Sequence, residues 1–462
     1  MYQCVWYRKD LRVGDHPALT QAMQQGPTVA LFVHTPEQWQ QHHMATRQRH
    51  FIESNLVALR AQLAELNVPL LEVNWQDFAN TEQNLANWCQ ANQIGAVHCH
   101  QEPELNERRR DAAVSERLSA VGIDFHQYHG DCLLPYGAVT NQSGAMYRRF
   151  TPYRNAAVKL MAGQAMTVLP VPVAQAPLSV KSQELAKDHQ DLLWPAGEGE
   201  ASKRLTAFAV AKAVDYQTAR DTPSIDGTSS LSPYLALGVI SPKQCLAALI
   251  SHTDNPFLAP ESGAFSWLNE LIWRDFYRHL LVACPSLSKG LPFVEKGRMI
   301  RWNNDPEQFK AWCRGETGYP LVDAAMRQLL QTGWMHNRLR MVVASFLTKH
   351  LMIDWRWGER FFSEHLVDGD LAANNGGWQW SASTGCDAQP YFRMFNPIRQ
   401  SEKFDPKGIF IRNLIQPLGH LTNQQVHMPD ESVRPAGYPP PLVEHSWARA
   451  RALDHFSVLG KS

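Results

Sequence analysis

The chain has 462 residues, of which 44% are apolar, so it is long enough for two or three domains with cores of their own. Basic and acidic side chains number 44 each, and the zero formal net charge gives no support for wholesale coating of nucleic acid or membrane. The eight cysteines form no C-x-x-C pair, so we expect reduced thiols, no metal site and a cytoplasmic location. The charged N-terminus is unlike a signal peptide and no apolar run reaches about 18 residues, so we expect no membrane association.

Residues 1–130 alternate short apolar segments with amphipathic ones. The segments CVWY, TVALFVH, PLLEV, AVHCH and DFHQYH predict strands, and residues 46–67 and 106–122 carry apolar residues at helical spacing. This alternation predicts a doubly wound parallel-sheet (Rossmann-like) domain. No G-x-G-x-x-G follows the first strand, which excludes a standard dinucleotide site there.

The rest of the chain divides into a connector and a helical part. Residues 131–200 include a long stretch rich in proline, alanine and polar residues, which indicates an interdomain linker. Residues 201–462 repeat apolar residues at helical spacing and predict a larger all-helical domain. Most of the 15 tryptophans fall in this part, which favours either a tryptophan-rich core or stacking on planar ligands.

Three motifs carry candidate functional residues. In GTSSLSPYLALG (227–238) the hydroxyls before Pro233 indicate a phosphate site at a helix start, or an ordinary capped helix. In WLNELIWRDFYRHL, Glu270 and Trp273 are neighbours on one helix face, typical of a base-binding pocket or of a surface ion pair above core aromatics. In GWMHNRLRM, one face combines Asn337, Arg340 and Met341, and by itself this pattern favours packing with a surface charge.

A fourth segment, DGDLAANNGGWQWSASTG (368–385), combines acids, asparagines, a Gly-Gly pair and two nearby tryptophans. A core helix would not place acids and asparagines beside glycines, and a loop would not normally carry two tryptophans so close together. The segment therefore predicts contact with a large planar ligand that is polar at one edge.

In their order along the chain and in their residues, these motifs resemble those of the photolyase and cryptochrome family. The resemblance extends from VWYRKDLRVGDHPAL through FTPYRNA (150–156) and TGYPLVDAAMRQLLQTGWMHNRLRMVVASFL to YFRMFNP (391–397), and covers essentially the whole chain. It is strongest to the class I photolyases, which repair cyclobutane pyrimidine dimers in DNA. It implies an α/β N-terminal domain and a helical C-terminal domain that holds FAD in a bent form.

The resemblance also implies a set of flavin contacts. Asn374 is expected to face N5 of the isoalloxazine, where an amide would favour the reduced or semiquinone flavin. The implied FAD-binding residues are Tyr216, Thr228, Ser229, Ser230, Leu231, Ser232, Trp267, Arg340, Asp368, Gly369, Asp370 and Asn374.

For DNA, the resemblance implies a pocket that receives a flipped-out dimer and is lined by Glu270, Trp273, Asn337, Arg338, Met341 and Trp380. Arg220, Arg338 and Arg393 match phosphate-contacting positions, so affinity should fall with salt. Trp302, Trp355 and Trp378 match a tryptophan relay that reduces photoexcited flavin. The implied reaction is light-driven electron transfer from reduced FAD to the dimer by a monomeric enzyme, without acid, base or metal catalysis.

Photolyases can also bind a second, light-harvesting chromophore, the antenna. The sequence indicates its identity less clearly than that of the flavin. Asn106, Glu107 and Lys289 match positions that hold a 5,10-methenyltetrahydrofolate antenna. A deazaflavin is the alternative antenna, and a helix N-cap with a first-turn acid is the alternative interpretation of Asn106 and Glu107.

Two departures and four rival identities accompany this resemblance. His16 follows Asp15 where many relatives have Asn, and Ser230 stands where relatives often have Arg, which removes a cation near the flavin. The main rival is a cryptochrome-type light sensor, which usually has a long extension beyond the YFRMFNP region. A (6-4) photolyase usually has histidines in place of Asn337 and Met341, and DASH-type cryptochromes typically have Tyr in place of Trp380. A flavin- or DNA-binding protein without repair would not need the dimer pocket.

Overall fold

The computed structural model describes residues 1–164, 166–190 and 192–460. Its packing separates two compact units, which we call the sheet unit and the helical unit. The sheet unit comprises Met1–Val214, Ser229–Pro285 and Val367–Asp370; the helical unit comprises Asp215–Thr228, Ser286–Leu366 and Leu371–Ser462. None of the helices in the described part of the chain combines the length and hydrophobicity that a membrane crossing needs.

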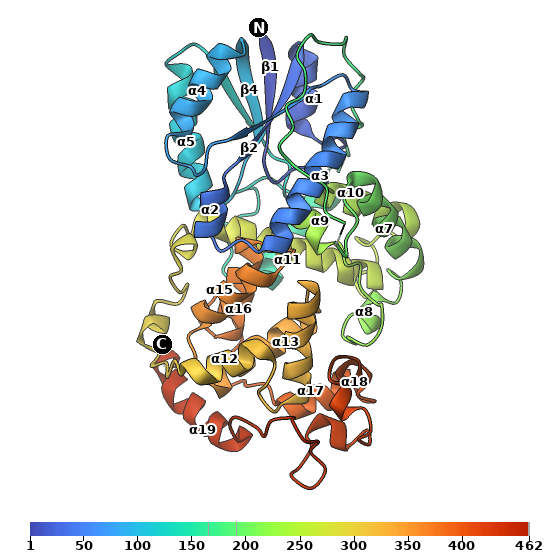
Figure 1. The fold of residues 1–462 in the computed structure, drawn as a ribbon, viewed down its shortest axis with the longest axis vertical. Helices are drawn as coiled ribbons and strands as arrows, with labels where there is room; N and C mark the ends of the chain where they lie inside the picture. Colours follow the sequence, from blue (N-terminus) through green and yellow to red (C-terminus); the bar gives the residue numbers. More distant parts are fainter. Residues whose placement is uncertain (165, 191, 461–462) are drawn as a thin grey trace. The chain divides into compact units, whose positions relative to one another are not determined.

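The sheet unit is built on five parallel strands in the order β3-β2-β1-β4-β5 (Figure 1). The strands are β1 (Tyr2–Tyr7), β2 (Thr28–His34), β3 (Leu70–Asn74), β4 (Ile94–His100) and β5 (Asp124–Tyr128). Helices α4 and α5 lie on one side of the sheet, with α1 and α3 on the other (Figure 1). Because both faces are covered, the central strands are buried along nearly their whole length, and the predicted doubly wound sheet is confirmed.

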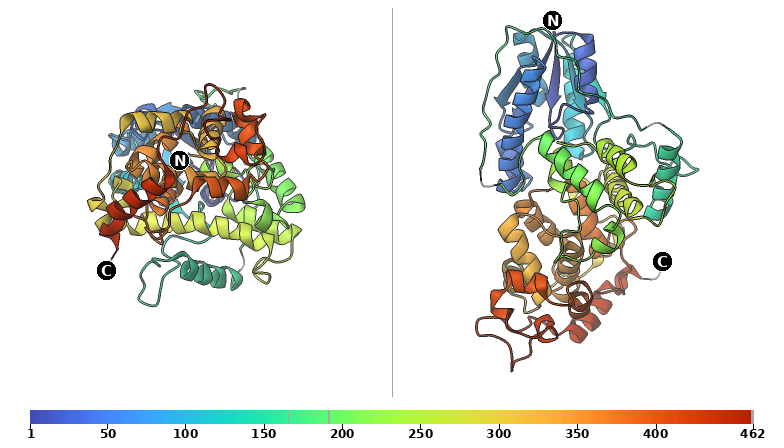
Figure 2. Two further views of the ribbon diagram at one scale, coloured as in Figure 1. Left: turned by 90° about the horizontal axis from the view of Figure 1, so that it is seen from below. Right: turned by 90° about the vertical axis from the view of Figure 1, so that its right-hand side faces the viewer.

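Ten helices belong to the sheet unit in the described residues. They are α1 (Pro17–Gln25), α2 (Pro36–Gln41), α3 (Thr46–Glu65), α4 (Thr81–Ala91), α5 (Leu105–Ser119), α6 (Phe150–Ala162), α7 (Glu198–Ala211), α9 (Ser232–Ala236), α10 (Pro242–His252) and α11 (Gly263–Ala283). Helices α3 and α5 match the two predicted segments. Helix α6 falls within the proposed linker and packs alongside α11, as the two views of Figure 2 show.

Local sequence explains where the helices that carry site residues begin. Ser262 caps α11 by accepting a hydrogen bond from the Phe265 amide at 3.0 Å. Ser241 and Gln244 form a reciprocal capping box at the start of α10. In the helical unit, Asp354 accepts from the Arg356 amide at 3.0 Å and starts α15.

The regular elements of the helical unit are all helices, as predicted. They are α8 (Tyr216–Ala219), η1 (Leu287–Lys289), η2 (Glu295–Met299), α12 (Pro306–Arg314), α13 (Pro320–Thr332), α14 (Asn337–Ser345), η3 (Phe346–His350), α15 (Trp355–His365), α16 (Leu371–Ser381), α17 (Pro397–Phe404), α18 (Ile409–Leu414), η4 (Gln416–Leu418), η5 (Gln425–His427), α19 (His445–Phe456) and η6 (Ser457–Leu459). Their main core is an apolar cluster that includes Trp312, Trp355 and Trp378, and a smaller cluster lies around Phe456. The element η3 is a π-helical turn that continues α14.

Candidate functional site

The acidic start of the 368–385 segment is anchored inside the sheet unit. Asp370 accepts hydrogen bonds from Nη1 and Nη2 of Arg278 at 3.2 and 2.6 Å. The same guanidinium donates from Nε to Asp131 at 2.6 Å. The Gly369 carbonyl accepts from Gln48 at 2.6 Å, and Asp368 is buried. The sequence prediction missed Arg278, which fixes the position of one predicted flavin contact.

Asn374 has its amide orientation set by helix α15. Its Nδ2 donates to the Glu359 carbonyl at 2.9 Å and to the Ser363 hydroxyl at 3.1 Å. A flipped amide would place its oxygen against the Glu359 carbonyl, where two acceptors repel, so Oδ1 is the end left for a ligand. Next to it, Nδ2 of Asn375 donates to Oε1 of Glu359 at 2.8 Å. Burial raises the pKa of this glutamate to about 7, although the Asn375 bond opposes the rise.

One face of α16 carries small residues and leaves room for a planar ring. Ala373 and Gly377 lie one turn apart and are both exposed. A Cβ built on Gly377 would meet no atom within 4 Å, so nothing in the chain fills the space beside it. The neighbouring Asn374 and Trp380 are half-buried. A planar group with one polar edge, such as the isoalloxazine of FAD, fits this combination of small residues, amide and indole.

The three predicted relay tryptophans belong to the helical unit and differ in burial. Trp355 and Trp378 are buried in the main core, and Trp302 packs against that core while remaining partly exposed. The Trp378 indole is held by edge contacts with Phe362 at 5.0 Å and Trp312 at 6.1 Å between ring centroids. This arrangement provides aromatic rings both in the core and at its margin. The relay itself stays a prediction.

The serine-rich segment is fixed by two indole hydrogen bonds in the sheet unit. Trp267 Nε1 donates to the Ser229 hydroxyl at 3.3 Å, and Trp194 Nε1 donates to the Ser230 carbonyl at 3.1 Å. Ser230 has φ 49°, a left-handed conformation. The cap residue of the short helix α9, Leu231, is buried and makes no side-chain cap bond, so the segment is not an ordinary capped helix start. The exposed Ser232 is the first residue of that helix.

Two further predicted flavin contacts lie in the helical unit. Tyr216 is buried, and the Arg220 guanidinium lies 5.4 Å from the centre of its ring. Arg340 donates from Nε to the Met335 carbonyl at 2.8 Å. Thr228, at the end of the same chain segment, is half-buried.

Helix α11 carries the Glu270–Trp273 pair, and both side chains are half-buried. Trp273 stacks on Phe150 of α6 with a centroid distance of 3.6 Å and an interplanar angle of 7°. Phe276 contacts the Trp273 indole at its edge, at 5.7 Å. Phe150 therefore covers one face of this indole, a support that the sequence prediction missed.

Three of the four predicted dimer-pocket residues of the helical unit lie on α14, and the fourth, Trp380, lies on α16. Arg338 contacts the Met341 sulfur at 3.9 Å, and Asn337 beside it is exposed. The Arg338 guanidinium also pairs with Asp221 at 2.6 Å and lies over Phe404 at 4.6 Å. Its charge is thus already balanced within the chain, so a phosphate would have to compete with Asp221.

The remaining predicted cations are more accessible. Arg393 and Lys289 are both exposed. Lys289 ends the short helix η1. Their side chains are therefore available to a ligand from solution.

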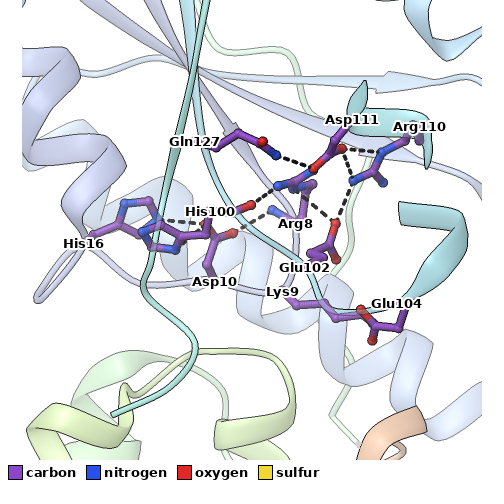
Figure 3. Close-up of polar contacts among 10 residues, drawn as sticks. All are labelled: Arg8, Lys9, Asp10, His16, His100, Glu102, Glu104, Arg110, Asp111 and Gln127. Carbon is purple, nitrogen blue, oxygen red and sulfur yellow. Dashed lines mark hydrogen bonds and ion pairs between the residues drawn. The ribbon is translucent and has the colours of Figure 1, made fainter. Parts of the chain in front are cut away.

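The carboxyl ends of β1 and β4 form the topological switch point of the sheet, the usual ligand position in this fold. Here ion pairs fill it (Figure 3): Arg8 and Arg110 pair with Asp111, each at 2.7 Å, and Lys9 pairs with Glu104 at 2.6 Å. The cavity among them measures about 20 Å³, which is room for about one water. A tricyclic chromophore does not fit there without rearrangement of these charges.

The sequence departure at His16 belongs to the same region (Figure 3). His16 caps α1 by accepting from the Leu19 amide at 3.0 Å. Its Nε2 lies 3.1 Å from Oδ2 of Asp10, and Nδ1 of His100 lies 3.0 Å from the same oxygen. Burial alone would raise the pKa of Asp10, but the hydrogen bonds from His100 and His16 hold it well below its usual range. Burial lowers the pKa of His100 to about 3.

The predicted antenna residues open helix α5. Its N-cap is Glu104, without a side-chain cap bond, so the alternative interpretation of Asn106 as the cap is wrong. Asn106 is exposed and its amide lies 3.3 Å from Nε2 of His42. Glu107 is a buried first-turn acid whose pKa is raised by burial.

Known families and proteins match the chain along nearly its whole length. The model described as "DNA photolyase" matches residues 3–175, and "FAD binding domain of DNA photolyase" matches residues 267–458. A deoxyribodipyrimidine photo-lyase of Vibrio cholerae is 47% identical and covers 97% of this chain and 98% of its own.

Solved structures agree with these matches. A class III photolyase from Agrobacterium tumefaciens has a TM-score of 0.86 and 32% identity over 100% of this chain and 98% of its own. A cryptochrome from Synechocystis sp. PCC6803 has a TM-score of 0.84 and 26% identity over 98% of each chain. Because these relatives match both the sheet unit and the helical unit, the chain belongs to the photolyase and cryptochrome family, with the FAD-binding domain of the DNA photolyases.

Proposed function

We propose that the protein is a class I photolyase that splits cyclobutane pyrimidine dimers in DNA under light. The observation that carries the proposal is helix α16, which combines an oriented Asn374 amide, the open Gly377 face and a half-buried Trp380. A light sensor that only binds flavin needs the first two features but not the third. The 47% identity with a deoxyribodipyrimidine photo-lyase, which extends over 97% of this chain, supports repair over sensing.

Reduced FAD, when bound, would be the photoexcited donor of the electron that splits the dimer. The residues that would hold it are the serine-rich segment with Trp267, the Asp368–Asp370 turn, Tyr216, Arg340 and Asn374. Arg278 and Gln48 keep that turn in place. Asn374 Oδ1 would accept a hydrogen bond at the flavin edge, since its Nδ2 is already used by α15.

The dimer would be received by Glu270, Trp273, Asn337, Met341 and Trp380. Photolyases are among the enzymes that flip their target out of the duplex, and a poorly stacked lesion costs less to extrude. Phe150 holds Trp273 from one side, so the indole would present a fixed surface to the lesion. Base stacking on such an aromatic contributes about 1 to 3 kcal/mol per base. Glu270 would accept a hydrogen bond from an exposed base edge.

Phosphate contacts would come from Arg220, Arg338 and Arg393. Of these, Arg393 is exposed, whereas Arg338 is paired with Asp221. The two arginines should therefore differ in how much each contributes to DNA affinity. Affinity should fall with salt even though the net charge is zero, because each cation that neutralises a phosphate releases counterions from the DNA.

Trp378, Trp355 and Trp302 would carry electrons from the protein surface to the oxidised flavin. Burial supports Trp302 as the surface end of this relay, since it remains partly exposed while Trp355 and Trp378 are buried. The antenna would be methenyltetrahydrofolate bound near Asn106, Glu107 and Lys289. The filled switch point favours folate over a deazaflavin placed inside the sheet edge. We further propose a cytoplasmic monomer.

The deciding experiment illuminates the reduced protein with an oligonucleotide that carries one cyclobutane dimer, and separately with one that carries a (6-4) product. Repair of the first alone is expected. Repair of neither would refute the function in favour of a sensor, and repair of the second would refute the class.

A matched pair of variants tests the pocket. Trp273→Ala should weaken binding to dimer-containing DNA by about 10- to 100-fold, the equivalent of about 1 to 3 kcal/mol, while leaving flavin occupancy nearly unchanged. Trp447→Ala is the control, because Trp447 is an exposed tryptophan on α19. Equal losses of DNA and flavin binding in Trp273→Ala would mean that this residue is only structural.

A further inference from the structure

Three side chains that the proposed repair reaction does not use meet in the interior of the sheet unit. Cys132, Asp275 and His279 are all buried, and one ligand atom from each lies within 4.8 Å of the other two. Asp275 and His279 are one turn apart on α11, so their side chains leave the same helix face. Cys132 comes from the loop that follows β5, more than a hundred residues earlier.

The backbone next to Cys132 orients the other two side chains. His279 Nε2 lies 3.2 Å from the Leu134 carbonyl, an acceptor, so Nε2 carries the proton and Nδ1 carries the lone pair. Asp275 Oδ2 accepts from the Leu133 amide at 2.8 Å. The remaining atoms, Asp275 Oδ1 and His279 Nδ1, are buried and have no hydrogen-bond partner.

Such unpaired atoms are costly in a buried site, because each has lost water without gaining a partner. Here two of them belong to side chains that are each only 2% exposed and that lie close to Cys132. Each side chain is also held by its second polar atom, as metal-binding histidines and carboxylates usually are. The cluster thus has free ligand atoms and the outer bonds that orient them.

We propose that Cys132 Sγ, Asp275 Oδ1 and His279 Nδ1 bind a Zn²⁺ ion. Sulfur and imidazole ligands favour zinc over magnesium or calcium, which prefer oxygen alone. A thiolate, a carboxylate and a neutral imidazole together balance the two positive charges, so the buried site is electrically neutral. Zinc bonds of roughly 2.0 to 2.3 Å would draw the three ligand atoms closer together than the separations of up to 4.8 Å between them.

Two neighbouring groups complete the site and limit it. The Tyr153 hydroxyl is buried without a hydrogen-bond partner, and its ring lies 5.6 Å from the His279 ring, edge to face. A water in the fourth zinc position would give this hydroxyl a hydrogen-bond partner. Arg274 Nη1 lies 3.9 Å from Asp275 Oδ1 and repels a cation, but that guanidinium is shared with Asp131 and with the Leu235 carbonyl.

A second buried trio also has a ring nitrogen without a hydrogen-bond partner, Nε2 of His100, but its other histidine is committed to a helix cap. Asp10, His16 and His100 also lie close together. Because His16 Nδ1 accepts the Leu19 amide proton, its Nε2 carries the hydrogen and points it at Asp10. A metal at that position would require the helix cap to break. The difference identifies the Cys132 cluster as the metal site of the sheet unit.

Zinc at this position would tie the loop after β5 to helix α11, the helix that carries Glu270 and Trp273. Ligand binding to the folded state stabilises it according to ligand concentration over Kd. The site therefore has a structural role, and its loss should change thermal stability more than the chemistry of repair.

The test uses the full-length protein with its flavin. After treatment with a chelator and its removal, the protein is incubated with Zn²⁺ or Co²⁺ alone, dialysed, and its metal content measured by mass spectrometry. We expect one ion per chain, a higher Tm with Zn²⁺, and a thiolate-to-Co²⁺ charge-transfer absorption. Cys132→Ser should abolish that absorption and lower metal affinity at least tenfold, whereas Cys245→Ser, which removes a buried cysteine outside the cluster, should bind like the wild type.

Asp275→Asn provides a second variant in case Cys132→Ser is poorly folded, which circular dichroism and flavin content would reveal. It should also lower metal affinity, with the thiolate absorption weakened but present. Less than a tenth of an equivalent of either metal in the wild type would overturn the proposal. Unchanged stoichiometry and Co²⁺ spectrum in a folded Cys132→Ser would do so as well.

Discussion

Gly358 gives the sharpest prediction about the interior of the helical unit. It lies in α15 at a place where an added Cβ would be 2.1 Å from Cη2 and 2.4 Å from Cζ3 of Trp378, and 2.7 Å from a Leu347 methyl. Ordinary contacts of a Cβ begin near 3.4 Å. Gly358→Ala therefore forces the Trp378 indole to move by more than an ångström in a core where Phe362 and Trp312 already touch it.

Two opposing effects set the size of the change in unfolding free energy that Gly358→Ala causes. Overpacking a core costs about 1 to 3 kcal/mol, and a contact this short belongs at the upper end. Replacing glycine by alanine inside a helix stabilises the folded state by up to about 1 kcal/mol. We expect a net loss of about 2 kcal/mol, which lowers Tm by about 4 to 8 °C in a unit of some 150 to 250 residues. If Trp378 opens the relay, photoreduction of the oxidised flavin should also slow.

The assay is thermal unfolding of the full chain together with flavin photoreduction under steady light. Gly199→Ala is the matched control, because a Cβ on this α7 glycine would meet nothing within 4 Å. The control should be unchanged or slightly more stable. A Gly358→Ala protein that behaves like the control in both measurements would refute the packing argument.

Three further predictions concern the relay, the flavin face and a buried charge. Trp302→Phe should block photoreduction of oxidised flavin but leave repair by chemically reduced enzyme nearly unchanged; loss of both would contradict the relay. Gly377→Ala should stabilise the flavin-free protein by up to about 1 kcal/mol yet weaken FAD binding measured by fluorescence, and unchanged affinity would mean that no ring lies there. Burial lowers the pKa of Lys349 to about 7, below its unfolded value of about 10.5, so the unfolded state binds more protons and wild-type stability should rise with pH between these values. The stability of Lys349→Met relative to wild type, from denaturant unfolding, should accordingly fall by about 3 to 4 kcal/mol from pH 7 to pH 10, and a constant difference would contradict the buried neutral amine.

Local patterns predicted the elements whose burial follows a simple period. The five strands, α3 and α5 lie where apolar spacing indicated. Helix α6 was not predicted as an element, although its buried residues Phe150, Tyr153, Ala157 and Met161 recur at helical spacing and pack toward α11. The boundaries at residues 130 and 200 stay predictions, and the two compact units divide the chain differently.

The resemblance could name site residues but not their partners. Arg278, Ser363 and Phe150 each orient a named residue from a distant position in the chain. The same limit applies to the Cys132 cluster, because no spacing rule connects a loop cysteine with a helix that begins more than a hundred residues later. Side-chain partners of this kind arise from tertiary packing and have no local signature.

Asn374 illustrates how a partner determines function. An asparagine offers a donor and an acceptor at nearly the same place, so its identity alone does not decide which one a ligand meets. The α15 carbonyl of Glu359 accepts only, and it takes the Nδ2 end. The Ser363 hydroxyl accepts from the same amide and donates to the same carbonyl at 3.1 Å, which strengthens that choice. If the flavin edge lies against Asn374, as we propose, it would meet an acceptor, and a flavin protonated at that edge would be favoured over one that is not.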